Sequence, residues 1–322
     1  MFRIKTYCCA VFLFTCLTAN AQDPYLSVKP AMPLFFNPAY AGNEYYTRAT
    51  LNYRNHYPAS GTGFATYSAS FDTYIDRYNS GIGLTLMSDQ LGSKSYSYTS
   101  AGLVYSYKIS VGQSNSIKAG LMANLYYGIN NPNDLAFPDM INPDGTVVIV
   151  EPTQFYEKQS EFGVDFGFGG LFDSDYFEAG AAVYHLGKED KYVYWSRPLR
   201  IYAHAEWKIP IFSGTKYMPS RGLTRYLENS TLKPVAFFIR QADVTLFGAG
   251  VLYNFLNFNV GLYSRQNFKL NAFTESFHIG YISDIMDVHY IFDFGFTGKN
   301  FRGLATSSHE IGLVFKFVTG KE

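Results

Sequence analysis

The most constraining feature of this sequence is its last regular stretch, residues 309–317, which reads His-Glu-Ile-Gly-Leu-Val-Phe-Lys-Phe. Ile311, Leu313, Phe315 and Phe317 alternate with small or polar residues, and a period of two predicts a β-strand. An apolar, aromatic-rich face opposite a polar one fits either a half-buried sheet or a strand with one side in lipid. A final strand that ends on an aromatic residue is typical of bacterial outer-membrane barrels.

The amino-terminal residues 1–21 are predicted to form a cleaved signal peptide. Arg3 and Lys5 begin it, an apolar run follows, and Ala19-Asn20-Ala21 supplies the small residues of a cleavage site, so the mature chain is expected to start at Gln22. The apolar run is too short for a spanning helix, which disfavours an uncleaved anchor. All three cysteines lie in this segment, so we expect no disulfide, cysteine metal site or cysteine nucleophile in the mature chain.

The composition favours a membrane barrel over a soluble domain. Aromatic residues make up 18% of the chain, with 28 Tyr, 29 Phe and also 28 Gly. Tyr and Phe at this density suit the aromatic girdles and lipid-facing band of a barrel. The 26 basic residues less Arg3 and Lys5 leave 24 against 26 acidic ones, and this near-balance disfavours nucleic acid as a partner.

Alternating patterns recur along the chain and predict one all-β domain at residues 45–318, a transmembrane antiparallel β-barrel of about 14 strands, of outer-membrane type. No run of about 18 apolar residues follows the signal peptide, so no transmembrane helix is predicted. An even number of strands is what a closed barrel needs, because lipid cannot satisfy the hydrogen bonds of an open sheet edge. The predicted strands are residues 45–53, 63–73, 80–88, 96–109, 115–128, 160–172, 176–186, 198–210, 230–240, 242–254, 257–264, 275–283, 286–297 and 307–318.

The connections between the predicted strands indicate an orientation. Those after even-numbered strands are mostly tight and rich in Asp, Asn, Gly or Ser, whereas several after odd-numbered strands are long. Outer-membrane barrels keep short turns in the periplasm, so residues 22–44 are expected to form an amino-terminal periplasmic segment. Two connections do not fit: the one near residues 211–229 is long on the periplasmic side, and the one near Gln241 is short on the outer side.

The inward faces of the predicted strands carry charges of both signs. They admit two interpretations, paired charges that fill a narrow lumen or the lining of a selective pore, and fourteen strands lie between the filled and the open barrels in width. The proline-containing loop at residues 130–160 either folds inward as a plug or stands outside as a recognition loop. The polar residues expected in the lumen include Arg48, Glu161, Asp165, Arg200, His204, Glu206, Asp287, His289 and Asp293.

Catalytic and metal-binding motifs give little signal. The sequence has no G-x-S-x-G elbow and no H-E-x-x-H motif. Asp287 with His289, and His204 with Glu206, share a strand face as an acid–base pair would, but a hydrogen bond in a solvated lumen is the better explanation of such pairs. We therefore predict that the protein is not an enzyme and has no cofactor and no metal site.

A set of motifs in a fixed order carries a family resemblance. Residues 36–42 read Phe-Asn-Pro-Ala-Tyr-Ala-Gly, and residues 53–58, 81–92 and 307–311 follow with Tyr-Arg-Asn-His-Tyr-Pro, a Gly-Ile-Gly start with a Ser-Asp-Gln-Leu-Gly end, and Ser-Ser-His-Glu-Ile. Together they resemble the PorP/SprF family of type IX secretion system membrane proteins. Residues 28–31, Val-Lys-Pro-Ala, differ from the Gln/Tyr/Met-rich stretch that often precedes Asn-Pro-Ala in that family.

The resemblance implies a non-enzymatic outer-membrane component of type IX secretion, a system associated with gliding motility and cell-surface adhesins. The implied partners are outer-membrane lipid, the secretion machinery, and a secreted protein recognised through its C-terminal sorting domain. A fourteen-stranded barrel is too narrow to pass a folded adhesin domain, so the expected role is docking or anchoring. The alternative is an outer-membrane diffusion channel or small-solute transporter.

The Asn-Pro-Ala-Tyr-Ala-Gly segment admits two interpretations. One is a turn, because Pro38 disfavours helical backbone at the preceding Asn37 and Gly42 supplies backbone freedom before the first strand. The other is a contact with the secretion machinery in the periplasm, made by Asn37, Pro38, Tyr40 and Gly42.

Overall fold

The structure is a computed structural model that describes residues 23, 26–27, 29–44, 46–58, 64–92, 95–131, 142, 158–187, 197–212, 230–269, 272–297 and 306–317. The predicted signal peptide and nearly all of the long loop at residues 132–157 lie outside these residues, as does the connection at residues 213–229.

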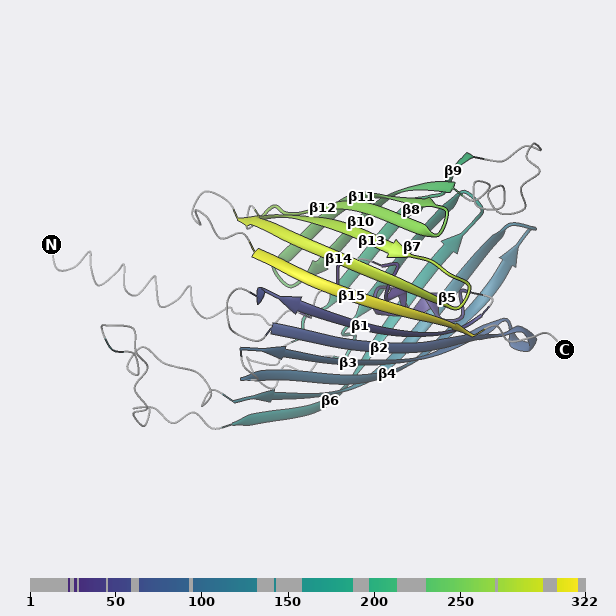
Figure 1. The fold of residues 1–322 in the computed structure, drawn as a ribbon. Helices are drawn as coiled ribbons and strands as arrows, with labels where there is room; N and C mark the ends of the chain where they lie inside the picture. The colour runs from purple at the N-terminus through teal and green to yellow at the C-terminus, as the bar shows by residue number, and fades with distance from the viewer. Residues whose placement is uncertain are drawn as a thin grey trace.

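The strands form one closed antiparallel barrel (Figure 1). Its seam pairs β1 with β15, from Thr47 opposite Phe317 to His56 opposite Ser308. β8 and β9 run along the same neighbour, β10, on either side of Lys208, so the fifteen segments form fourteen wall strands and the predicted fold class is confirmed. The strands are β1 Thr47–His56, β2 Phe64–Ile75, β3 Ser80–Leu91, β4 Tyr96–Val111, β5 Asn115–Asn130, β6 Gln159–Asp173, β7 Phe177–Tyr184, β8 Arg200–Trp207, β9 Ile209–Phe212, β10 Ser230–Gln241, β11 Val244–Phe255, β12 Phe258–Asn267, β13 Ala272–Tyr281, β14 Met286–Thr297 and β15 Thr306–Phe317.

The predicted strand at residues 198–210 differs most from the structure, because it is broken into β8 and β9. Pairing with β10 stops between Val235 and Leu232, where Pro234 has no N–H to donate. Pro210 in β9 lies beside the same break. Two prolines on neighbouring strands therefore interrupt the ladder where the alternating side-chain pattern alone predicts a continuous strand.

The barrel wall has an apolar outer face and a small or polar inner face. Leu103 is 69% exposed, whereas its neighbour Val104 is 4% exposed, and the same alternation runs through most of β4, β5 and β6. The exposed face is rich in Leu, Ile, Phe and Tyr, which is the lipid-facing band that an outer-membrane barrel requires.

The two ends of the barrel differ in their connections. At one end, the turn end, the links at residues 76–79, 112–114, 174–176, 256–257 and 282–285 are short, and β1 begins there. The opposite end, the loop end, carries the long links 57–63, 131–158 and 185–199. The two connections that did not fit the pattern remain exceptions, since the link 242–243 at the loop end is short and the link 213–229 at the turn end is long. Outer-membrane barrels in general keep their short turns in the periplasm. No helix among the described residues is long and apolar enough to cross a membrane.

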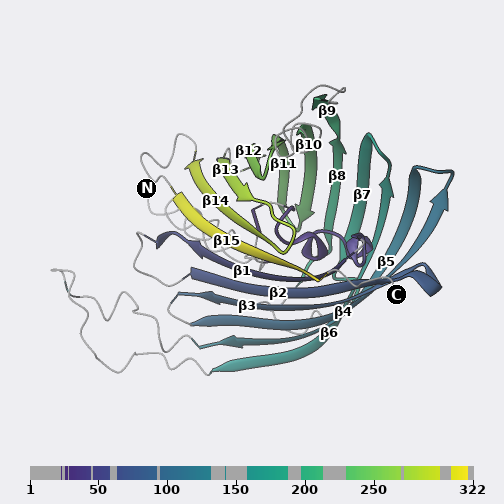
Figure 2. The same ribbon diagram turned by 45° about the vertical axis from the view of Figure 1, so that its right-hand side comes forward.

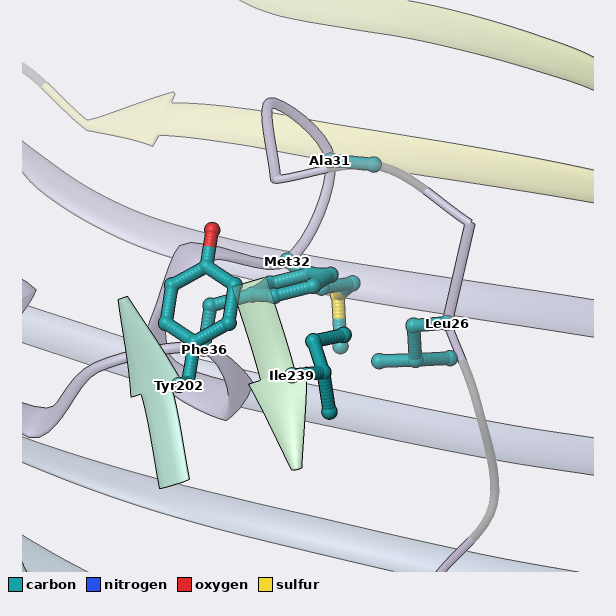
Figure 3. Close-up of a cluster of buried hydrophobic side chains, with 6 residues drawn as sticks. All are labelled: Leu26, Ala31, Met32, Phe36, Tyr202 and Ile239. Carbon is teal, nitrogen blue, oxygen red and sulfur yellow. The ribbon is translucent and has the colours of Figure 1, made fainter. Parts of the chain in front are cut away.

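The hydrophobic core of the protein lies inside the barrel rather than between two sheets. The described residues between 23 and 44, here called the plug segment, pass through the lumen (Figure 2) and contain the 3-10 helices η1 Pro33–Phe35 and η2 Pro38–Tyr40. Leu26, Ala31, Met32 and Phe36 pack there against Tyr202 and Ile239 of the wall (Figure 3). Residues 22–44 were expected to lie in the periplasm, whereas the described part of this segment lies within the barrel, where its apolar side chains are buried.

Candidate functional site in the barrel lumen

The four residues assigned to a machinery contact, Asn37, Pro38, Tyr40 and Gly42, all lie within the barrel. Asn37 is 0% exposed and Tyr40 is 3% exposed. The Asn37 side chain accepts a hydrogen bond from the Ala39 backbone N–H at 2.9 Å and caps η2. Its Nδ2 donates to the carbonyl oxygens of Gly170 and Ala181 at 2.9 and 3.2 Å. In this conformation the wall covers these residues, so a periplasmic partner would reach them only after the segment leaves the lumen.

Glycines on the inner face of the wall make room for η2. A Cβ on Gly120 of β5 would overlap the backbone of Pro38 and Ala39, and a Cβ on Gly169 of β6 would overlap the side chain of Asn37. The sequence pattern alone does not connect these glycines with the Asn-Pro-Ala-Tyr segment. The signal that could have connected them is glycine at inward-facing strand positions. Glycine there lets another backbone pack closely against the wall, and an empty barrel has no such backbone inside.

The end of the plug segment turns sharply into β1. Gly42 has a φ of +59°, a backbone conformation that glycine adopts without strain. Its N–H donates to Oδ2 of Asp72 at 2.9 Å, and Asp72 is also paired with Arg48, Nε to Oδ1 at 2.9 Å. The interpretation of Gly42 as a source of backbone freedom therefore agrees with the observed turn.

A first charged cluster holds the plug segment near the turn end. Lys29 lies between Glu178 of β7 and Glu206 of β8, with Nζ to carboxylate oxygen distances of 2.5 and 2.9 Å. The Tyr40 hydroxyl donates to Glu178 and lies 2.6 Å from Nε2 of His204. One cation and one hydroxyl of the plug segment thus satisfy two buried wall carboxylates, which would be costly to leave unpaired.

A second cluster binds Ser27 of the plug segment. The backbone N–H of Ser27 donates to Glu310 at 2.9 Å, and the Ser27 hydroxyl donates to Asp293 at 2.7 Å. Arg54 pairs with both carboxylates at 2.6 and 2.8 Å. Arg265 adds an ion pair to Asp293 at 3.0 Å and donates to the Ser27 carbonyl at 3.1 Å.

A third cluster, here called the Asp23 pocket, lies at the loop end. The Asp23 carboxylate accepts from Nε2 of His185 at 2.6 Å and lies 3.4 Å from Arg200 and 3.6 Å from Arg197. The other ring nitrogen of His185 lies 2.6 Å from Asp165. Burial by itself lowers the pKa of His185, but the Asp23 and Asp165 carboxylates outweigh it and raise this pKa to about 9, so the imidazole is protonated at neutral pH.

All nine polar residues expected in the lumen lie on the inner face. Asp165 and Arg200 belong to the Asp23 pocket, and His204 and Glu206 bind the plug segment, as described above. Glu161 is half-buried on the same face of β6 as Asp165. The plug residues that these side chains bind, Asp23, Ser27 and Lys29, were not singled out from the sequence, because isolated polar residues in an aperiodic segment carry no pattern.

The two candidate acid–base pairs are not paired in the structure. Asp287 binds Lys316 at 2.6 Å, whereas His289 lies 3.0 Å from His278. His204 contacts Tyr40 and Glu178, whereas Glu206 binds Lys29. Among the described residues, no group of three or more His, Cys, Asp or Glu side chains is arranged to hold a metal ion.

Three cavities among the described residues border the plug segment. One of about 360 Å³ lies at the turn end and is lined by charged residues of both signs, including Lys29, Glu178, Glu206, Lys233 and Lys316. A second, of about 60 Å³, lies at the loop end beside the Asp23 pocket. The third, of about 30 Å³, lies beside Ser27, Lys29 and Phe36. The buried residues of the plug segment lie between the first two, so the described lumen is largely filled at its middle. The proposed inward plug at residues 130–160 falls almost wholly outside the described residues.

Comparisons with known proteins agree with this architecture. The family described as "Type IX secretion system membrane protein PorP/SprF" matches residues 18–315. The toluene transporter TbuX of Ralstonia pickettii is 8% identical with a TM-score of 0.56, covering 89% of this chain and 94% of its own. The monoaromatic hydrocarbon channel CymD is 11% identical with a TM-score of 0.54, covering 90% and 93%. At these identities the two structures show a shared barrel fold alone. No curated protein matches the sequence.

Proposed function

The chain belongs to the PorP/SprF family of type IX secretion membrane proteins, and from this premise we propose that it docks or anchors a secreted protein through that protein's C-terminal sorting domain. The coarser role is that of an outer-membrane component of the secretion system, as the family and the barrel fold require. The docking role adds a specific activity, recognition of the exported protein at the loop end.

One observation carries the proposal: the lumen is occupied. Ala31, Met32, Leu34, Asn37 and Ala39 are all 0% exposed inside the wall. A barrel filled by its own chain at mid-height offers no passage to a folded domain, so a secretion role has to be exercised on its surfaces. The loop end is the surface that faces a protein already outside the cell.

The occupied lumen also argues against the diffusion-channel alternative. An open pore needs a continuous aqueous path, whereas here the side chains of the plug segment meet both sides of the wall, at Tyr202 and Ile239 on one side and Val104 and Leu171 on the other. The TbuX and CymD barrels are a transporter and a channel by name, but at 8% and 11% identity they support the fold and not the activity.

The first experiment is mass spectrometry of the cell surface and medium from a strain that lacks this gene. Loss of one large protein with a C-terminal sorting domain would identify the dedicated partner. Loss of the whole secreted set would assign the protein to the core machinery. An unchanged secretome would refute a secretion role for this copy and favour the channel.

A second experiment tests docking directly. The barrel and the candidate sorting domain are purified together from detergent extracts of wild-type cells, with an unrelated outer-membrane barrel as the matched control. Specific recovery of the sorting domain is expected. Its absence, in a preparation whose barrel unfolds cooperatively on heating, would contradict the docking role.

A further inference from the structure

The cationic side chains of the Asp23 pocket are held in place by neighbouring aromatic rings, as in an anion-binding site. Arg197 lies between two tyrosine rings, 4.0 Å from the centroid of Tyr98 and 4.6 Å from that of Tyr126. Arg200 lies 5.8 Å from the ring of Tyr184. Stacking of this kind fixes the plane of a guanidinium group and so preorganises its N–H donors. The wall thus holds two cations in place independently of the plug segment.

The groups that contact Asp23 carry an excess of positive charge. His185, which is protonated, Arg197 and Arg200 lie against Asp23, and Asp165 pairs with the far side of His185. Asp89 is a further carboxyl close enough to interact with Asp23. Among the five groups in direct contact, Asp23 lowers the net charge from about +2 to about +1. Uncompensated buried charge is costly, so a pocket without Asp23 would favour another anion in its place.

Asp23 enters the pocket as part of a short peptide with an apolar anchor. Its backbone N–H donates to Oε1 of Gln241 at 3.1 Å. Leu26, three residues later, is 4% exposed and lines the adjoining cavity with Phe35, Met87 and Met122. Two of these wall positions are methionines, whose flexible side chains adapt to different apolar groups. The pocket therefore binds a carboxylate and an apolar side chain a few residues apart.

Several buried polar atoms beside Asp23 have no hydrogen-bond partner among the described residues. They are Nη1 of Arg197, Oδ1 of Asn124, the hydroxyl of Tyr184 and Nε2 of Gln241. Asn124, Tyr184 and Arg197 line the 60 Å³ cavity, and Asn124 and Tyr184 are each only 7% exposed. Buried polar groups are normally paired, so donors and acceptors left free beside a small cavity indicate a ligand with more polar atoms than Asp23 provides.

From these observations we infer that the Asp23 pocket is a binding site for a peptide carboxylate, which the plug segment occupies with its own Asp23, and that an acidic segment of the secreted partner replaces it. The identity of the partner rests on the proposed function; the chemistry of the site does not. Because the two carboxylates compete for one set of cations, binding of the partner releases the outer end of the plug segment.

The test measures peptide binding to the full-length barrel in detergent. The probe is a carboxy-terminally fluorescein-labelled, amino-acetylated peptide with the sequence of residues 22–30, followed by fluorescence anisotropy. The Asp23→Asn barrel is expected to bind it about tenfold or more tightly than wild type, because its own segment no longer supplies a charged competitor. The matched control is Asp243→Asn, which removes an exposed carboxylate at the same end and should bind like wild type.

Three further arms decide the assignment. A peptide with Asn in place of its Asp should bind the Asp23→Asn barrel at least tenfold more weakly, and adding Arg200→Gln to that barrel should abolish binding. Equal binding of the two peptides, or of the probe to the wild-type and Asp23→Asn barrels, would overturn the inference. Equal competition by propionate would overturn the peptide assignment in favour of a small free carboxylate. Thermal unfolding of each variant confirms that the barrel is folded.

This assay separates the inference from the proposed function. Sorting-domain recovery that fails while the peptide still binds would refute docking and leave the pocket intact. Recovery that succeeds in an Arg200→Gln barrel without peptide binding would keep docking and refute this pocket as its site.

Discussion

The position of the plug segment against the barrel wall can be tested by adding one side chain to the wall. Gly120 faces η2 from β5, and a Cβ there would lie 2.6 Å from Cα of Ala39 and closer still to two other backbone atoms of the plug segment. Backbone cannot rotate away as a flexible side chain can, so Gly120→Val should push the segment off the wall. Overpacking of a filled interior costs about 1–3 kcal/mol, which corresponds to an increase of roughly 5- to 150-fold in the population with a displaced plug segment.

The assay uses the absence of cysteine after residue 16. A single reporter thiol replaces Met32, which is 0% exposed in the lumen, and its maleimide labelling rate is measured in detergent. The rate should rise in Gly120→Val by the same 5- to 150-fold, with an increase in conductance across planar bilayers. The matched control is Gly170→Ala on the neighbouring strand, where the nearest atom to an added Cβ is 4.0 Å away. A labelling rate equal to that of the control, in a barrel that is folded, would refute this position.

Three further perturbations test the lipid face and the charged clusters. Phe294→Lys places a charge on the outer face beside Phe292 and Phe296. It should cost about 2–4 kcal/mol of unfolding free energy if this residue faces the bilayer midplane, and urea titration in lipid showing no loss would disprove the face assignment. Lys29→Met removes the cation that Glu178 and Glu206 share, and Glu206 keeps only its longer 3.6 Å contact with Lys233; the plug segment should loosen by up to about 3–5 kcal/mol, measured as faster labelling of the reporter thiol, and unchanged labelling would count against the cluster. His185 has a raised pKa of about 9, so its stabilisation is complete below about pH 6.5 and is lost as the pH rises through 9; thermal unfolding should show this loss in wild type and not in His185→Gln, and identical profiles would argue against the pair with Asp23.

The wall of the barrel could be predicted from the sequence because the alternation of side chains within each strand shows which face lies in lipid and which faces the lumen. Alternation such as Phe162, Val164, Phe166 and Phe168 against small or charged neighbours fixes which side faces lipid, and the structure exposes these four side chains. Where prolines interrupt pairing, as at Pro234, the pattern of side chains is unaffected and the break in the ladder goes unseen.

The occupant of the lumen could not be predicted in the same way. The plug segment has no period, since η1 and η2 are single short turns, and its partners are distant in sequence: Ser27 binds Glu310, 283 residues away. Individual residues were nonetheless informative. Asn37 before Pro38 admitted a turn or a machinery contact from the sequence, and the structure shows it capping a short turn of 3-10 helix. Its burial depends on close approach to Gly169 and Gly180 of the wall, which the sequence does not connect with it.

The position of Asp23 at the loop end has a consequence for assembly. The chain reaches the turn end only at β1, so the plug segment crosses the whole height of the lumen before the first strand starts. If the β1–β15 pairing formed first, the barrel would already be closed. The plug segment would then have to enter lengthwise through an opening no wider than the segment itself. We therefore expect the wall to be laid down around the segment, with the seam as the last pairing to form. The plug segment then acts as a template for the curvature of the sheet, and a chain without it should stall as an open sheet rather than yield an empty pore.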